Sequence, residues 1–419
     1  MREVCEGCVA AAGALCILRG RRYPLGMAAR EERLRSAEPQ IAISQSSTRS
    51  LPRWITRILD ELTIPGEIET ASGQMFSFGH GAPQFRIKFR RDSLFRDAQD
   101  ELSLGRAYVN GEIDLEGDML ALLDARSQLS DRFRVWNSTR QFIERWLVPA
   151  KRLNRHVINR HYTLGNDFYF GFLDRRYRFY SHCLFQRDDE ELEEAAEHKL
   201  ETTFSALQLQ PGMRVLDIGA GWGGTFQYCC PRGIHMTGIT LFENSRGYVS
   251  GLIQRDRLDG SISLQDFLAF RPPEPFDAIV MYGVIEHIPD YGRFFARVRE
   301  CLKPGGRIYL DGAASKTKYS MSQFTRQYTW QGAHSFMHLP ELTQRALEQG
   351  FAVEEVKDET HDYELTMLHW ARRFDENHEA IVSGWSEETY RSFRLFLWGG
   401  SHAFKTDRLQ AYHIVARRK

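Results

Sequence analysis

The sequence predicts an α/β fold, in which a doubly wound, mostly parallel sheet is preceded by a small α+β domain. The first observation is a short apolar strand at residues 215–218 that leads into four closely spaced glycines. The second is the rhythm that follows, since apolar strands that alternate with helical patterns are typical of a parallel sheet. The third is an earlier segment in which apolar and polar residues alternate as in half-buried strands.

The glycine-rich stretch is the candidate ligand-binding turn. Gly219, Gly221 and Gly224 satisfy G-x-G-x-x-G, but a dinucleotide site also needs an acidic residue about 20 positions later, at the end of the next strand. That strand ends at Thr240, and the nearest acidic residue after it is Glu243. An Asp-x-Gly-x-Gly sequence after an apolar strand resembles instead motif I of the S-adenosylmethionine (SAM) methyltransferases. The alternative is a glycine-rich turn that binds no ligand.

Later strands keep the order expected of such an enzyme. The resemblance implies that the strand at 236–240 ends near the ribose and that the strand ending at 263–267 lies near the adenine. Strands at 276–281 and 302–310 follow, and the latter begins with a Leu-Lys-Pro-Gly-Gly turn that also matches the methyltransferase pattern. SAM is therefore the expected cofactor. The predicted cofactor-binding residues are Tyr180, Ser181, Asp217, Gly219, Gly221, Gly223, Thr240, Leu264, Gln265, Asp266 and Gly283.

Composition limits the other functions. The chain has 419 residues, enough for two domains, and its 55 basic residues balance its 55 acidic ones, so no charge excess indicates nucleic acid as a partner. No apolar run approaches the roughly 18 residues of a membrane span. The seven scattered cysteines favour a reducing cytosol over a disulfide framework. No His or Cys spacing predicts a metal site, and His334, His338 and His413 are expected to be structural.

Four regions are predicted along the chain. Residues 1–50 form a flexible extension, and residues 51–130 form the small α+β domain, with short antiparallel strands at 66–70, 75–79 and 84–89 and then a helix, a turn and an acidic loop. Residues 131–160 form a basic linker helix, and residues 161–419 form the methyltransferase domain. The acidic run at 188–197 is expected to be a solvated helix face.

The linker at 131–160 is rich in arginine and contains Trp136 and Trp146. A basic, tryptophan-bearing amphipathic segment can lie on an anionic bilayer surface. The alternative is a solvated helix that only joins two domains. The first interpretation predicts a peripheral protein at the inner, cytoplasmic face of the membrane.

Several motifs together resemble the cyclopropane-fatty-acyl-phospholipid synthase family. They are His-Tyr-x-Leu-Gly-Asn-Asp-Phe-Tyr from His161, Tyr180-Ser181, the glycine-rich stretch and Glu286-His287. An amino-terminal motif from Leu104 to Asp118 matches as well, as does the spacing of Tyr363, Thr366 and Trp370. The resemblance covers about residues 55–419.

The resemblance implies methyl transfer from SAM to a cis double bond in a phospholipid acyl chain, followed by loss of a proton and ring closure. In the family a bound bicarbonate lies beside the cationic centre. Residues matched to its site make Glu286, Tyr363, Asp311 and His182 the predicted catalytic residues. Asp311 stands where the family has a histidine, His182 where it has a first cysteine, and Gly400 where it has a second.

Asp311 makes bicarbonate doubtful, because an aspartate beside a glutamate is a poor host for an anion. One hypothesis is that Asp311 replaces the anion as base or cation stabiliser and shares a proton with Glu286. Another is that the cation is quenched differently, which gives a methyl-branched or methylene-bearing chain. A third is that Asp311 only caps its strand.

Three functions remain open on sequence alone. The preferred function is C-methyl transfer to unsaturated acyl chains of membrane phospholipids. The others are methyl transfer to a small non-lipid metabolite and lipid binding without catalysis. A homodimer is compatible with all three.

Overall fold

The computed structural model describes residues 51, 55–56, 59–94, 101–128, 164–317, 321–329 and 335–419. The predictions for the extension at 1–50 and for the basic helix at 131–160 lie outside these residues. From Leu51 onward the chain forms one compact unit that contains two sheets. No helix among the described residues is long and apolar enough to cross a membrane.

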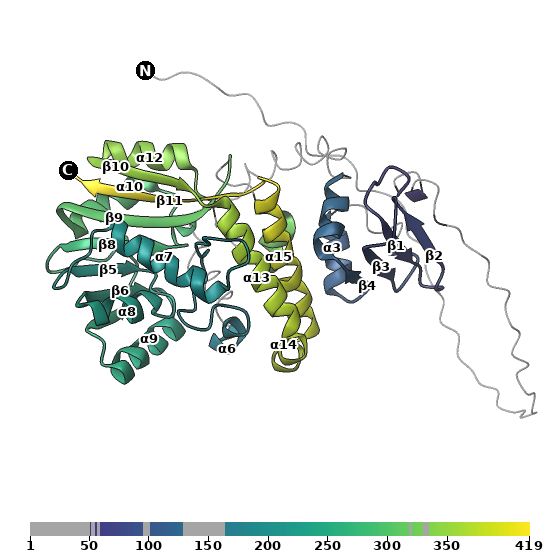
Figure 1. Ribbon diagram of the computed structural model, residues 1–419, viewed down its shortest axis with the longest axis horizontal. Coiled ribbons are helices and arrows are strands. Elements are labelled where there is room, and N and C mark those ends of the chain that lie inside the picture. The colour runs from purple at the N-terminus through teal and green to yellow at the C-terminus, as the bar shows by residue number, and fades with distance from the viewer. Residues whose placement is uncertain are drawn as a thin grey trace, which may run out of the picture. The chain divides into compact units, whose positions relative to one another are not determined.

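The larger sheet has seven strands in the order β10-β11-β9-β8-β5-β6-β7 (Figure 1). Strands β5 to β9 are its parallel part, and they confirm the predicted doubly wound fold. Their bounds are β5 Arg214–Ile218, β6 His235–Thr240, β7 Gly260–Leu264, β8 Phe276–Tyr282 and β9 Leu302–Ala314. Strand β7 ends at Leu264 rather than at Phe267, because Asp266 begins a turn in which its carboxylate accepts the Leu268 N–H.

Two further strands extend this sheet in a way that the sequence did not predict. Strand β11 (Gln410–Arg418) lies between β9 and β10 (Phe351–Asp358) and runs antiparallel to both. In this register His413 lies opposite Asp311 on β9. Because side chains of directly opposed residues point to the same face of a sheet, β11 brings a histidine beside the predicted catalytic aspartate.

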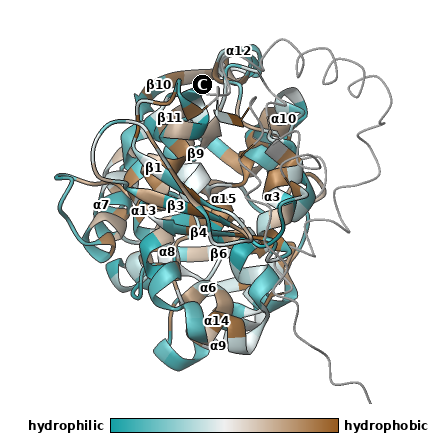
Figure 2. Ribbon diagram, turned by 90° about the vertical axis from the view of Figure 1, so that its right-hand side faces the viewer, coloured by the Kyte–Doolittle hydropathy of each residue, from teal (hydrophilic) through white to brown (hydrophobic). Residues whose placement is uncertain are grey.

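Helices cover both faces of the sheet (Figure 1). Each face has its own apolar core, one with α7, α8 and α13 and the other with α10 and α12. The amphipathic pattern is visible in Figure 2, where single helices carry both hydrophilic and hydrophobic residues. The helices of this part are α6 Asn166–Phe170, α7 Leu192–Ala206, α8 Gly224–Cys229, α9 Glu243–Asp256, α10 Tyr291–Cys301, α11 Gln323–Tyr328, α12 Leu339–Glu348, α13 Thr360–Glu376, α14 His378–Gly384 and α15 Glu387–Lys405.

The smaller sheet has the order β2-β1-β3-β4. The three predicted strands are present as β1 (Gly66–Glu69), β2 (Met75–Phe78) and β3 (Phe85–Phe89). The prediction that all are antiparallel was wrong, since β3 pairs parallel with β1. The reason is that the β1–β2 hairpin returns the chain to the start of β1, so β3 begins there and runs in the same direction.

The predicted acidic loop is also a strand, β4 (Ile113–Gly117), which follows helix α3 (Glu101–Val109). Its carboxylates are paired across the sheet, as in Glu116 with Lys88 on β3. Asp114 also accepts a hydrogen bond from Arg391 of α15 at 2.7 Å. This contact links the smaller sheet to a helix that packs beside the larger sheet. Paired charges explain why an acidic segment forms a strand here.

Candidate active site

The glycine loop after β5 has the backbone that its sequence predicted. Gly219, Gly221 and Gly223 have φ values of 79°, 49° and 79°, which L side chains rarely adopt. A Cβ on Gly219 would lie 2.4 Å from a methyl group of Val284. At Gly221, which is exposed, the nearest atom would be the Gly219 carbonyl oxygen at 3.9 Å. The loop is therefore tight underneath and open at Gly221, where a ligand can approach the backbone.

This difference makes a testable prediction. Gly221→Ala should leave the protein folded, at a cost of about 1 kcal/mol for the positive φ, but should weaken SAM binding by at least about tenfold, because the new methyl group would fill the open space where we expect the cofactor. Isothermal titration calorimetry measures the affinity. Gly212→Ala is the matched control, since Gly212 also has a positive φ, 87°, and a Cβ added there would have nothing within 4 Å. Equal SAM affinity in both variants would remove Gly221 from the binding site.

The ends of β6 and β7 carry the remaining predicted cofactor contacts. Thr240 is buried at the end of β6, where its hydroxyl accepts the Phe242 N–H at 3.2 Å and its carbonyl accepts the Gln265 N–H at 2.9 Å. Leu264 is 48% exposed, and Gln265 and Asp266 are exposed beside it. An exposed leucine with a side-chain amide next to it suits a flat aromatic base with polar edges. These residues fit an adenosyl group.

Asp217, another predicted cofactor-binding residue, lies directly beneath the loop. Its side chain is buried below the loop and accepts a hydrogen bond from the Thr225 hydroxyl. Burial raises the pKa of this carboxyl to about 7. Ser245 in turn donates to the Gly221 carbonyl at 2.6 Å. These polar side chains hold the loop from beneath.

Tyr180, Ser181 and Gly283 lie together at the next part of the site. A Cβ on Gly283 would lie 3.3 Å from Ser181 Cβ, so the two backbones approach closely. The Tyr180 ring stacks on Trp370 of α13, with centroids 5.3 Å apart. The structure therefore brings these three predicted residues to the side of the sheet that α13 covers.

Asp311 has a partner that the sequence analysis missed. Lys199 Nζ of α7 lies 2.6 Å from Asp311 Oδ2, and both side chains are fully buried. The second carboxylate oxygen accepts the Gly283 N–H at 2.8 Å. Lys199 also donates to the Ser181 hydroxyl at 2.8 Å and to the His182 carbonyl at 2.6 Å. A buried ion pair thus links β9 to the segment that carries Tyr180 and Ser181.

Glu286 lies in a short 3₁₀ turn, Ile285–His287, beyond the end of β8. Its Oε1 accepts the Ala313 N–H at 2.8 Å, and its buried Oε2 has no hydrogen-bond partner among the described residues. Burial raises the pKa of the carboxyl to about 7, and the nearby Asp311 carboxylate adds to the rise. An ionisable oxygen that is buried without a partner is the kind of group that stabilises charge in a closed site.

His182 belongs to a second buried cluster, with Glu359 and His413. His182 Nε2 lies 2.7 Å from Glu359 Oε2, and His413 Nδ1 lies 2.6 Å from Glu359 Oε1. Although burial alone would raise it, the hydrogen bonds from the two imidazoles hold the pKa of Glu359 well below its usual range. The Tyr363 ring lies 4.9 Å from the His182 ring. The structure therefore brings the predicted residues His182 and Tyr363 together.

The sequence analysis did not identify Lys199, Glu359 and His413 as site residues, and the sequence pattern marked only some of them. Lys199 lies on the buried face of α7, which the apolar positions Leu192, Ala195, Ala196 and Leu200 define in the sequence, so the helical period marks it. The acidic run at 188–197 was expected to be a solvated helix face, but two of its carboxylates form ion pairs, Glu193 with Arg373 and Glu197 with Arg176. Glu359 and His413 carried no such mark, because the pairing of β11 with both β9 and β10 brings them together.

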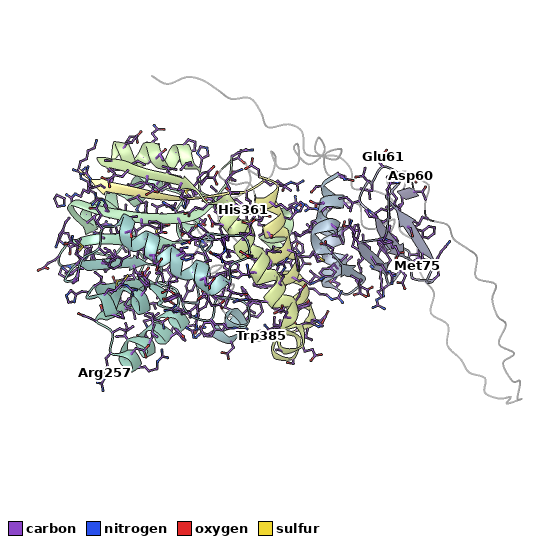
Figure 3. The ribbon with its side chains drawn as sticks, viewed as in Figure 1. Asp60, Glu61, Met75, Arg257, His361 and Trp385 are labelled. Atoms are coloured by element: carbon purple, nitrogen blue, oxygen red, sulfur yellow. The ribbon has the colours of Figure 1, made fainter. Side chains whose placement is uncertain are left out.

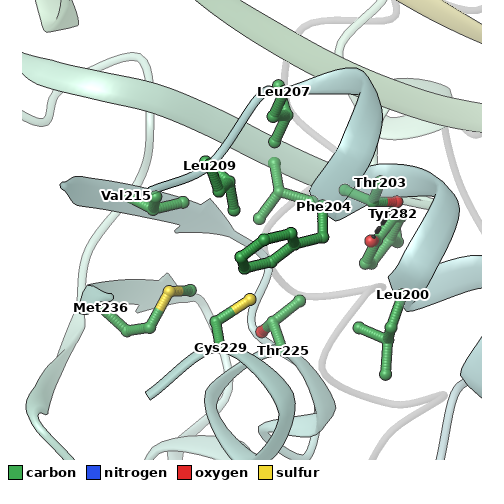
Figure 4. Close-up of a pocket in the computed structure, with 11 residues that line it drawn as sticks. Leu200, Thr203, Phe204, Leu207, Leu209, Val215, Thr225, Cys229, Met236 and Tyr282 are labelled. Carbon is green, nitrogen blue, oxygen red and sulfur yellow. Dashed lines mark hydrogen bonds between the residues drawn. The ribbon is translucent and has the colours of Figure 1, made fainter. Parts of the chain in front are cut away.

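One cavity among the described residues lies elsewhere. Apolar side chains of α7 and the strands line most of it, and the Tyr282 hydroxyl donates to Thr203 at its edge, at 2.6 Å (Figure 4). None of the predicted site residues lines this cavity. It is a packing gap between α7 and the sheet and is separate from the glycine loop.

Comparison with known proteins identifies the family. The family model described as mycolic acid cyclopropane synthetase matches residues 150–414. The chain belongs to this family. It is 28% identical to the cyclopropane-fatty-acyl-phospholipid synthase of Escherichia coli (strain K12), over 81% of this chain and 89% of that one. It is 26% identical to a probable fatty acid methyltransferase of Pseudomonas putida, over 85% and 93% of the two chains.

Comparison with a solved structure supports the same family. The mycolic acid cyclopropane synthase CmaA1, complexed with SAH and CTAB, matches with a TM-score of 0.59 and 26% identity, over 63% of this chain and 98% of that one. The family member described here is a SAM-dependent methyltransferase, as predicted. Its predicted function, modification of unsaturated lipid chains, is confirmed at the level of the family, and the non-lipid alternative is not favoured.

Proposed function

We propose that this enzyme transfers the methyl group of SAM to a double bond in an acyl chain of a phospholipid and closes a cyclopropane ring. The observation that carries the proposal is the buried Glu286 carboxylate, whose Oε2 has no hydrogen-bond partner among the described residues. When bound, SAM supplies an electrophilic methyl group, and an alkene that accepts it becomes cationic. A carboxylate held in a buried site stabilises such a charge far more than it would in water.

SAM would be held by the loop at Gly219–Gly223 and by the ends of β6 and β7. The open backbone at Gly221 would approach the amino-acid part, and Leu264 and Gln265 would meet the adenine. Parallel sheets of this kind bind ligands at the carboxyl ends of their strands, which is where these residues lie.

Glu286 and Tyr363 would act on the acyl chain. Glu286 would present Oε2 to the developing cation while Oε1 stays fixed by the Ala313 N–H. The Tyr363 ring stacks on Phe404 at 4.3 Å and lies 4.9 Å from the His182 ring, so its faces are covered and it would act by shaping the wall of the site. The buried Glu286 carboxylate would then supply the charge stabilisation.

Asp311 would support the site and would not itself be the base. Its carboxylate faces Lys199 on one oxygen and the Gly283 N–H on the other. Through Lys199 it fixes Ser181, which lies next to Tyr180 in the proposed cofactor site. One hypothesis from the sequence was that Asp311 shares a proton with Glu286. The fully buried Lys199 instead provides Asp311 with a positively charged partner.

The residues present do not fit a bound bicarbonate. The Ala313 N–H already donates to Glu286, and the Gly283 N–H already donates to Asp311. Asp311 also places a second carboxylate beside Glu286, where the family has a histidine, and two carboxylates repel an added anion. We propose a reaction without this anion, in which the protein supplies all the charges.

We further propose that the enzyme acts at the surface of the membrane, because its substrate chains lie in the bilayer. The basic, tryptophan-bearing segment at 131–160 would be the contact, and it lies outside the described residues. Vesicle sedimentation with anionic and with zwitterionic lipid checks this proposal. Binding that is equal on both would leave the segment without an electrostatic role.

Lipid mass spectrometry tests the reaction. Expression in a host without its own cyclopropane synthase should add one CH₂ group to monounsaturated phospholipid chains, and ozonolysis should find that the modified chains lack a double bond. A modified chain that keeps its double bond would indicate a methyl-branched product. No lipid change, with SAM binding intact, would favour the small non-lipid substrate.

A further inference from the structure

The cluster of His182, Glu359 and His413 has a role in the proposed reaction that goes beyond packing. We propose that His182 is the base that takes the proton in ring closure and that Glu359, clamped by His413, is the positioning residue that orients it. This inference rests on the proposed function, since it names the group that completes the same reaction. It concerns a set of side chains that are all fully buried.

The hydrogen bonds of His182 suit a base. Its Nε2 lies 2.7 Å from Glu359 Oε2, while its buried Nδ1 has no hydrogen-bond partner among the described residues. Nε2 carries a proton because a carboxylate only accepts, whereas a second proton on Nδ1 would be a buried donor without an acceptor, so Nδ1 keeps its lone pair. A neutral imidazole with a carboxylate behind it and a free nitrogen in front is the arrangement of a general base.

Glu359 is held at both oxygens. His413 Nδ1 lies 2.6 Å from Oε1. The other nitrogen of the His413 ring, Nε2, is 3.5 Å from Glu355 Oε1 and makes no hydrogen bond among the described residues, so Glu359 is the fixed partner of both imidazoles. A carboxylate that is clamped in this way keeps the His182 ring in one orientation.

The charged groups around this cluster are consistent with His182 Nδ1 as the proton acceptor. Lys357 Nζ is 4.0 Å from Glu359 Oε1, and Asp362 of α13 is close enough to interact with His182. On the other side, Lys199 donates to the His182 carbonyl and pairs with Asp311, which lies opposite His413 on β9. The positive and negative groups are therefore paired locally, and the free Nδ1 is left as an acceptor.

The location of His182 also fits a base. His182 directly follows Ser181 of the proposed cofactor site, and its ring lies 4.9 Å from that of Tyr363. The neighbouring histidine on α13 shows the contrast, because His361 is exposed and pairs with Asp188 and Glu364, both at 3.0 Å (Figure 3). Among the described histidines, His182 and His413 each combine Glu359 with a buried nitrogen that has no partner, and of these two only His182 directly follows Ser181.

The proposed reaction has two bond-forming steps. The alkene π pair forms a bond to the transferred methyl carbon while the methyl–sulfur bond breaks, with its electron pair left on sulfur. A C–H bond of that methyl group then breaks, its proton goes to His182 Nδ1, and its electron pair forms the third bond of the ring. His182 returns the proton to solvent when the product leaves.

Glu359→Gln is the test of the positioning role. It keeps the shape of the side chain but removes the charge, and we expect ring formation to slow by about 10²-fold, with a larger share of methyl-branched product that keeps its double bond. SAM affinity measured by calorimetry should not change. Glu364→Gln is the matched control, because Glu364 lies on α13, accepts from the exposed His361 ring at 3.0 Å and contacts no member of the cluster, and it should keep the wild-type rate and product ratio.

Nuclear magnetic resonance of ¹⁵N-labelled histidine in the wild-type protein gives a readout that needs neither activity nor a variant that folds. His182 should be protonated on Nε2 alone, and in Glu359→Gln this preference should weaken. Protonation of His182 on Nδ1 in the wild type, or a wild-type rate and product ratio in Glu359→Gln, would overturn the inference. A wild-type enzyme that modifies no lipid would instead overturn the proposed function.

Discussion

Replacing Glu286 by glutamine is expected to lower kcat by about 10²–10³-fold while SAM affinity stays within about twofold of the wild type. Glutamine can still accept the Ala313 N–H, so the turn at 285–287 should keep its shape. What is lost is the negative charge on Oε2, which we propose faces the cationic centre. Single-turnover lipid analysis measures the rate, and calorimetry measures the binding of SAM.

The same residue predicts a pH dependence. Burial raises the pKa of Glu286 to about 7, and only the ionised carboxylate stabilises a cation, so kcat should fall by up to about tenfold per pH unit below pH 7. Asp311 and Lys199 are the charged groups near this carboxyl, and they form an ion pair with each other. The acid limb attributed to Glu286 should be absent in Glu286→Gln.

Stability should respond with the opposite sign. Because the pKa of Glu286 is raised on folding, the folded state binds more protons than the unfolded state between about pH 4.5 and 7. The contribution of Glu286 to the free energy of unfolding is therefore fully present below pH 4.5 and is lost as the pH rises through 7. Glu286→Gln should flatten this part of the stability profile.

Glu190→Gln is the control for this variant. Glu190 is also buried and accepts a backbone N–H, that of Gln186 at 2.8 Å, but it lies in the turn before α7 and outside the proposed site. It should keep its turnover. Wild-type kcat in Glu286→Gln would remove the carboxylate from the mechanism.

Local sequence could predict those parts of the candidate site that a single strand and its turn create. Asp217 and the loop glycines are fixed by the apolar run of β5 and by backbone angles that only glycine adopts readily, so their pattern survives without tertiary information. The positions of Leu264 and Gln265 could also be predicted from local sequence. They stand at the end of a parallel strand, and such strand ends lie at the edge of the sheet where ligands bind.

The partners of Asp311 and His182 could not be predicted in that way. Asp311 could be recognised as unusual from a resemblance, but its pairing with Lys199 depends on how α7 docks on the sheet. Glu359 and His413 meet His182 only because β11 inserts between β9 and β10. An isolated histidine in a sequence carries no information about the strand beside it, so His413 was expected to be structural.

Replacing Lys199 by methionine is expected to destabilise the protein by roughly 3–5 kcal/mol, because it leaves the Asp311 carboxylate buried without its counter-charge. Both side chains are fully buried, so solvent does not screen the loss. The free energy of unfolding from urea denaturation measures the effect. Lys316→Met is the control, since Lys316 pairs with Asp407 at an exposed site and its loss should cost less than about 1 kcal/mol.

The double variant Lys199→Met with Asp311→Leu separates stability from function. Removing both charges should restore most of the lost free energy of unfolding, because an apolar pair often replaces a buried ion pair without cost. It should not restore SAM affinity, because Ser181 and the His182 carbonyl still lack the donor that fixes them. Recovery of both would mean that the pair serves folding alone. Recovery of stability without SAM affinity would mean that a buried lysine orders the segment from Tyr180 to His182, on which both the cofactor site and the proposed base depend.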